Sequence, residues 1–185
     1  MKKVCVITEA QMDIDILRKV LPARLTKDVE FVAGGGWSGA QSSAVTILAK
    51  RQIPVALVID AGANDEQIIR EKLDFSRWSL KQAAVQVPFE VFLAVPQIEA
   101  VFFQDQAFLE KVTNRKFTDL EWKLMKLQPK ELFADSPKEK AKLVRKILDN
   151  LNQDSTKVLQ THPLINALIN FLSSVLFEKE EQQAA

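Results

Sequence analysis

The first half of the chain alternates short apolar runs with apolar residues at helical spacing. The apolar runs are rich in β-branched residues and predict strands at residues 3–8, 29–33, 54–59 and 89–95. The helical spacing predicts helices at residues 12–25, which Pro22 is expected to end or kink, at 38–51 and at 66–73, whereas residues 75–88 give no clear pattern. Strands and helices that alternate in this way predict an α/β fold, with a parallel sheet of about four strands covered by helices on both faces.

The pattern changes after Pro96, because no further strand is evident. Helical spacing predicts additional helices at residues 98–112, 118–127, 137–151 and 163–178. We therefore divide the chain into an α/β core at residues 1–110 and a helical extension at residues 111–185 that packs on the core. The last helix is apolar on almost every side, which indicates burial either in the core or in a dimer interface.

Composition narrows the class of protein. With 185 residues, 47% hydrophobic and 26% charged, the chain suits one globular domain with a single core. No apolar run approaches the roughly 20 residues of a membrane span, and the first run is too short for a signal peptide. We therefore expect a cytoplasmic protein with no membrane contact. The single cysteine, Cys5, excludes an internal disulfide and a cysteine-based zinc cluster.

The charge is unevenly distributed although the net charge is only +1. Residues 111–146 contain eleven Lys and Arg against five Asp and Glu, whereas residues 1–110 contain twelve against fourteen. An acidic part joined to a basic part fits a metal site beside a phosphate-binding surface, and a pair of solvated helix faces is the alternative. If nucleic acid binds, we expect contacts from Arg115, Lys116, Lys123 and Lys126. The basic residues of the helix at 137–151 are expected to be solvated.

Carboxylates follow the predicted strands. Glu9 comes directly after the first strand and Asp60 after the third, Asp65 opens the next helix, and Glu99 follows the fourth strand. Ligands of open parallel sheets bind beyond the carboxyl ends of the strands, where crowded carboxylates repel unless a cation neutralises them. Oxygen ligands of this kind favour Mg²⁺ or Mn²⁺. Helix caps and a solvated sheet edge are the alternative, and Asp13 in particular is typical of an N-cap.

These residues resemble a known family. The run from Val4 to Ala10, with Glu9 after the strand and Asp13 four residues later, resembles the first toprim motif. The run Ile53–Gly62 resembles the second, in which a strand ends in Asp-x-Asp. The turn Gly34–Gly36 and the segment Ile98–Asp105 are similar to segments of small toprim-like proteins of phage defence, related to the overcoming-lysogenization-defect nucleases.

The resemblance implies a metal-dependent phosphodiester hydrolase or nucleotidyl transferase that acts on nucleic acid, such as a Mg²⁺-dependent nuclease. It implies catalytic roles for Glu9, Asp60 and Asp65, and Mg²⁺ or Mn²⁺ ligands at Glu9, Asp60, Asp65 and Glu99. One position departs from the pattern, because Gly62 replaces the second acid of Asp-x-Asp. The alternative is therefore a degenerate nucleic-acid-binding or regulatory module, accessory to a larger ATPase or defence system. A homo-oligomer is compatible with either function.

A glycine-rich turn offers a further candidate site. Gly34-Gly35-Gly36-Trp37-Ser38-Gly39 has the form G-x-G-x-x-G between a strand and a helix. Backbone N–H groups of Gly35 and Gly36, with Ser38, could contact a nucleic-acid phosphate. A nucleotide cofactor on Gly34–Gly39 is a third functional hypothesis. A tight turn with Ser38 as the N-cap would need no ligand.

Overall fold

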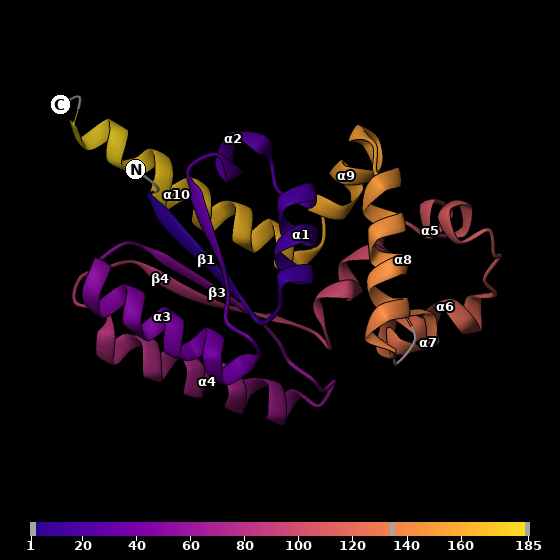
Figure 1. Cartoon of the computed structure of the whole chain (residues 1–185), viewed down its shortest axis with the longest axis horizontal. Coiled ribbons are helices and arrows are strands. Elements are labelled where there is room, and N and C mark those ends of the chain that lie inside the picture. The colour runs from indigo at the N-terminus through magenta and orange to yellow at the C-terminus, as the bar shows by residue number, and fades with distance from the viewer. Residues whose placement is uncertain (1–2, 134–135, 184–185) are drawn as a thin grey trace.

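The computed structural model describes residues 3–133 and 136–183, with side chains as far as residue 177. Its strands are β1 (Val4–Thr8), β2 (Val29–Ala33), β3 (Val55–Asp60) and β4 (Phe89–Ala94). Within the described residues they form one sheet in the order β2-β1-β3-β4, and every pair is parallel (Figure 1). This confirms the predicted α/β fold with a parallel sheet.

Helices cover both faces of the sheet (Figure 1). On one face lie α1 (Gln11–Val20), α2 (Ala23–Thr26) and α10 (Pro163–Gln183), and on the other lie α3 (Trp37–Arg51) and α4 (Glu66–Ala83). Side chains of a strand point alternately to opposite faces, so Val4 and Val6 join the first core and Cys5 and Ile7 the second. Because both faces are covered, β1 is buried along its whole length.

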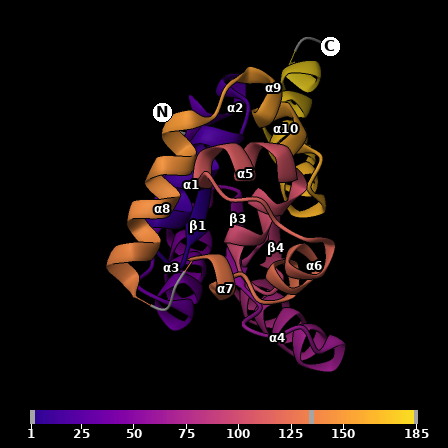
Figure 2. The same cartoon turned by 90° about the vertical axis from the view of Figure 1, so that its right-hand side faces the viewer.

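The remaining helices gather beyond the carboxyl ends of the strands, to the right of the sheet in Figure 1 and nearest the viewer in Figure 2. They are the 3₁₀ helix η1 (Ile98–Gln104), α5 (Gln106–Thr113), α6 (Asp119–Leu127), α7 (Lys130–Phe133), α8 (Pro137–Asn150) and α9 (Gln153–Gln160). Their apolar side chains belong to the same core cluster as α1 and α10. Leu168 and Leu172 of α10 are completely buried in that core, which decides between the core and the dimer interface for this part of the helix.

Several predicted boundaries were wrong. The segment predicted as one helix at 12–25 is two helices, and the interruption lies at Pro22, where it was expected, because proline has no N–H to continue the first helix. The helix at 66–73 extends to Ala83, through the segment that gave no clear pattern. Its period is obscured because Phe75 and Trp78 are 51% and 61% exposed while Leu80 is buried.

The C-terminal half contains shorter helices than predicted. The helix predicted at 98–112 is η1 followed by α5, and Asp105 caps α5 by accepting a 2.9 Å hydrogen bond from Phe108 N–H. The helices α7 and α9 were not predicted, because each is too short to show a period. In the described part of the chain, none of the helices combines the length and the apolar character needed to cross a membrane.

Candidate functional site

The strand order brings Glu9 and Asp60 together. The strands β1 and β3 are parallel neighbours, with Ile7 opposite Leu57, so the residues that follow them lie at the same edge of the sheet. The backbone N–H of Asp60 donates a 3.0 Å hydrogen bond to Oε1 of Glu9. The predicted convergence of these two acidic residues is therefore a feature of the structure.

The carboxylate of Asp60 is held by the segment that follows β4. Its Oδ1 accepts a 2.8 Å hydrogen bond from the N–H of Ile98, the first residue of η1. The Nζ of Lys72, from α4, donates to the carbonyl oxygen of Asp60. Asp60 is thus fixed by its backbone and by one carboxylate oxygen, while Oδ2 has no hydrogen-bond partner in the described part of the chain.

Asp13 is not the N-cap of α1 that the sequence indicated. It is the third residue of the helix, and its Oδ2 accepts a 2.8 Å hydrogen bond from the backbone N–H of Ala10. Asp13 is only 7% exposed. Its side chain points back to Ala10, in the loop that contains Glu9, although Ala10 itself is exposed.

Glu99 lies on η1 and is 1% exposed, the most buried acidic residue among those described. Its carboxylate accepts no hydrogen bond from the described residues. Its Oε1 lies 2.6 Å from Nζ of Lys140, whose side chain on α8 is 25% exposed. The expectation that the basic residues of this helix are solvated is therefore wrong for Lys140. A signal was available, since Lys140 precedes the buried Val144 and Ile147 by four and seven residues and so shares their helical face.

The four carboxylates form an electrostatic cluster. Burial is the main cause that raises the pKa of Asp60 to about 7, and the nearby Asp13, Glu99 and Glu9 add to it. Burial likewise raises the pKa of Asp13 to about 6, reinforced by Glu99 and Glu9 and opposed by the Ala10 hydrogen bond and by Lys140. Both side chains would release their protons more readily if a further cation were present.

The donors of this cluster fit a hard divalent cation held by a few carboxylates, but not a complete protein cage. Glu9 and Asp60 each use one oxygen for a backbone N–H, which leaves their second oxygens for another ligand. Among the described residues, no group of three His, Cys, Asp or Glu side chains is arranged to hold a metal ion. Mg²⁺ commonly takes one or two carboxylates together with water and substrate phosphates, and that is the arrangement the cluster would suit.

Asp65, the acid expected to complete the site in place of the acid missing at Gly62, lies away from Glu9 and Asp60. Asp65 is exposed at the start of α4, where its Oδ1 accepts hydrogen bonds from Gln67 N–H at 2.9 Å and Ile68 N–H at 3.1 Å. It is a helix cap, and no described contact joins it to Glu9 or Asp60, so the ligand and catalytic roles expected of it are not supported. Gly62 is exposed with a φ of +73°, and its N–H donates to the carbonyl of Pro96.

The glycine-rich turn supports Glu9 rather than presenting its donors to a ligand. The N–H groups of Gly35 and Gly36 both donate 2.9 Å hydrogen bonds to the carbonyl oxygen of Glu9. They are therefore not available to a phosphate, contrary to our expectation. Ser38 is not the N-cap either, because α3 begins at Trp37 after Gly36. This geometry agrees best with the alternative that Gly34–Gly39 is a tight turn that needs no ligand.

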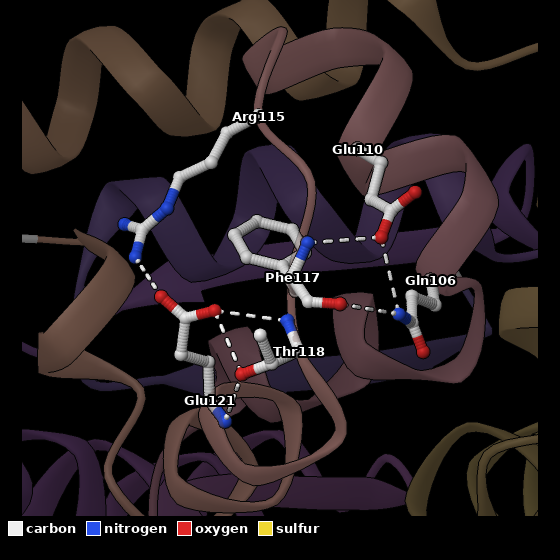
Figure 3. Close-up of polar contacts among 6 residues, drawn as sticks. All are labelled: Gln106, Glu110, Arg115, Phe117, Thr118 and Glu121. Atoms are coloured by element: carbon white, nitrogen blue, oxygen red, sulfur yellow. Dashed lines mark hydrogen bonds and ion pairs between the residues drawn. The ribbon is translucent and has the colours of Figure 1, made fainter.

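The basic residues predicted to contact nucleic acid are mostly engaged within the protein. Figure 3 shows Arg115 paired with Glu121 at 2.7 Å, in a network that also fixes the start of α6. The Nζ of Lys116 donates to Glu110 at 2.7 Å, and Lys126 lies over the ring of Trp122. The first two pairs lie at the loop between α5 and α6, and the third lies within α6. Of the predicted set, only Lys123 has no described partner.

Comparisons with known proteins concern the fold. No protein-family model and no curated protein sequence matches the chain. The C-terminal region of the Xanthomonas campestris pv. campestris OLD protein is similar in structure, with a TM-score of 0.54 at 11% identity over 97% of this chain and 98% of that chain. The C-terminal region of the Burkholderia pseudomallei OLD protein gives a TM-score of 0.46 at 12% identity over 100% of both chains. The first similarity confirms the toprim-like, OLD-related fold that the motifs predicted.

Proposed function

We propose that the chain is a toprim-like enzyme that breaks or transfers phosphodiester bonds of nucleic acid with the help of Mg²⁺ or Mn²⁺. The observation that carries this proposal is the hydrogen bond from Asp60 N–H to Glu9 Oε1, at 3.0 Å. It holds the carboxylate of Glu9 against the backbone of Asp60 at the ends of β1 and β3, where open parallel sheets bind their ligands.

Each acidic residue has its own role in this proposal. Glu9 and Asp60 would hold the divalent cation through Oε2 and Oδ2, the oxygens without a described hydrogen bond. When bound, such a cation stabilises the charge that develops on the phosphate and on the leaving oxygen. Asp13 faces the same loop, and a bound cation would lower the pKa of its carboxyl from about 6, so that the side chain would act as an ionised carboxylate that accepts a proton. Phosphate oxygens of the substrate would complete the ligand set.

The test is a nuclease assay with matched variants. Purified protein is incubated with plasmid and with single-stranded DNA in Mg²⁺, Mn²⁺ or EDTA. We expect metal-dependent cleavage that falls by at least about 100-fold in Glu9→Gln and in Asp60→Asn, a loss of about 2.7 kcal/mol in transition-state stabilisation. Asp65→Asn is the matched control, because asparagine also caps a helix, and it should cleave like the wild type. Cleavage that survives in Asp60→Asn would contradict the proposal.

A second function is favoured by the ion pair between Lys140 and Glu99. An internal ammonium group beside Glu99, together with glycine at position 62, would suit a degenerate module that binds nucleic acid or regulates a partner such as a larger ATPase. In that case neither the wild type nor any variant would cleave DNA in the nuclease assay. The wild type would still bind DNA, with the same affinity in EDTA and in Mn²⁺. Cleavage and binding together therefore separate the two functions.

A further inference from the structure

The helix α8 has two chemically different sides. Its inner side contributes buried apolar residues to the core. Its outer side carries basic residues that are all exposed, namely Lys138, Lys142, Arg145 and Lys146. At about 100° of rotation per residue, these four lie within an arc of about 100°. They form one face, which we call the basic stripe, while Lys140 lies on the inner side of the helix.

The four residues of the basic stripe have no described ion pair, and unlike the isolated lysines and arginines that also lack one, they share one helix face. Arg51, Arg77, Arg115, Lys116 and Lys140 each lie within 3 Å of a carboxylate oxygen. None of the four stripe residues forms an ion pair with the residues that the structure describes. Asp149 lies in the same arc and offsets part of this charge, but the face keeps an excess of positive charge that an anionic partner would neutralise.

The surface over the stripe is hollowed, which would let a ligand approach the helix closely. A shallow hollow of about 560 Å³ is lined by the stripe residues together with Ala141, Asp149 and Asn150. The small side chain of Ala141 lies between the longer ones and leaves room above the helix. From Lys138 to Arg145 the helix rises about 10 Å, which matches about three phosphates along one strand of a duplex.

The stripe is also adjacent to the acidic cluster. Lys140, on the same helix, reaches the buried Glu99. Arg145 lines a second hollow of about 240 Å³ between α8 and the start of α1, with Gln11 and Met12. Because α1 begins two residues after Glu9, this hollow lies between Arg145 of the stripe and the helix that follows the site loop. Figure 2 shows α8 at the outer edge of the molecule.

We infer that the basic stripe of α8 is the surface on which the sugar–phosphate backbone of nucleic acid docks, so that the strand passes to the acidic cluster. The inference rests on the proposed function and adds the surface that binds the substrate. Contacts from lysine and arginine to phosphates carry no base information. The binding should therefore be independent of sequence and should weaken as salt rises.

The test compares two triple variants of the full chain with the same change in charge. One replaces Lys138, Lys142 and Arg145 by glutamine. The other replaces Lys50, Lys81 and Arg70 by glutamine as well. These three residues are exposed on α3 and α4 and have no described ion pair. Binding of a short labelled DNA duplex is measured in EDTA from about 50 to 200 mM salt. Without metal no cleavage occurs, so binding is read independently of activity.

We expect the stripe variant to lose at least about tenfold in affinity at low salt, and its log–log salt slope to become less steep by about 2.7, or 0.9 for each of the three charges. The control variant should keep a slope close to that of the wild type. Equal losses in both variants, or a loss in the control alone, would overturn the inference. Absence of duplex binding by the wild type at low salt would overturn it too.

The outcomes are separable from those of the nuclease assay. Asp60→Asn should bind the duplex as well as the wild type does in EDTA, because Asp60 is not part of the stripe. If the stripe variant binds normally but the wild type cleaves DNA, the proposed function stands and the docking surface lies elsewhere. If the stripe variant loses binding but no preparation cleaves DNA, the docking surface stands and the catalytic proposal fails.

Discussion

The backbone N–H of Asp60 donates to Oε1 of Glu9 although 51 residues separate them in the chain. One hydrogen bond thus connects the ends of β1 and β3 through the same side chain that we propose as a metal ligand. Glu9 is held from the other side as well, because its carbonyl oxygen accepts from Gly35 and Gly36. The site is built into the sheet edge, so its geometry depends on the fold and not on a mobile loop.

Without metal, the free energy of unfolding should fall as the pH rises from about 4 to about 7. Burial raises the pKa of folded Asp60 from 3.8 to about 7, so in this range the folded protein retains a proton that the unfolded chain releases. Asp60→Asn should flatten this decline by up to about 4 kcal/mol and leave the protein equally or more stable at pH 8. Urea denaturation in EDTA at several pH values measures the effect. Parallel curves for wild type and Asp60→Asn would contradict it, and Asp65→Asn serves as the unchanged control.

Restoring the missing acid at position 62 should strengthen metal binding. Gly62 has a φ of +73° and open space where a side chain would start, and Asn and Asp tolerate this conformation better than most residues. Gly62→Asn and Gly62→Asp should therefore cost a similar strain of about 1–2 kcal/mol. Only the aspartate should then bind Mn²⁺ about tenfold more tightly, which adds about 1.4 kcal/mol of stabilisation at saturating metal. Thermal melts with and without Mn²⁺ measure this, and an identical metal response in both variants would count against the site.

Loss of the Lys140 ammonium should destabilise the protein. Lys140→Met leaves the carboxylate of Glu99 buried without its counter-charge, and we expect a cost of about 2–4 kcal/mol at neutral pH. Replacing Glu99 by Gln in the same protein should recover part of this loss, because the uncompensated charge is then absent. Lys142→Met, on the exposed side of α8, should change stability by less than about 0.5 kcal/mol. Chemical denaturation of the four proteins gives the comparison, and similar effects of Lys140→Met and Lys142→Met would show that the ion pair is unimportant.

The glycines of the turn after β2 should differ sharply in their tolerance of alanine. A Cβ on Gly34 would overlap the backbone of Ala40, whereas a Cβ on Gly35 would meet nothing within 4 Å. Gly34→Ala should cost about 3 kcal/mol or more through this clash. Gly35→Ala should cost only about 1–2 kcal/mol, for a φ of +75°. Denaturation midpoints test the difference, and equal costs would mean that the close approach of Gly34 to α3 is not needed.

The sequence by itself determined the type of fold and half of the site. Runs such as Val55–Asp60 are apolar almost throughout, because strands buried on both faces have no polar side, and this predicted a parallel sheet covered by helices. Acidic residues at the carboxyl ends of parallel strands lie at one edge of the sheet, so the sequence placed Glu9 and Asp60 at the same edge. Only the strand order, with β1 beside β3, makes them neighbours. These inferences depend on the order of apolar and acidic residues within short segments, which can be read directly from one sequence.

The tertiary structure decided which groups are buried and which donors are used. Lys140 is separated from Glu99 by 41 residues, and only the packing of α8 beside η1 places its ammonium in the acidic cluster. The same packing aims the basic stripe outward. The N–H groups of Gly35 and Gly36 carry no mark of their acceptor in the sequence, yet the neighbouring β1 and β2 direct them to Glu9. Such facts depend on long-range contacts, because burial and hydrogen-bond partners are properties of the assembled chain.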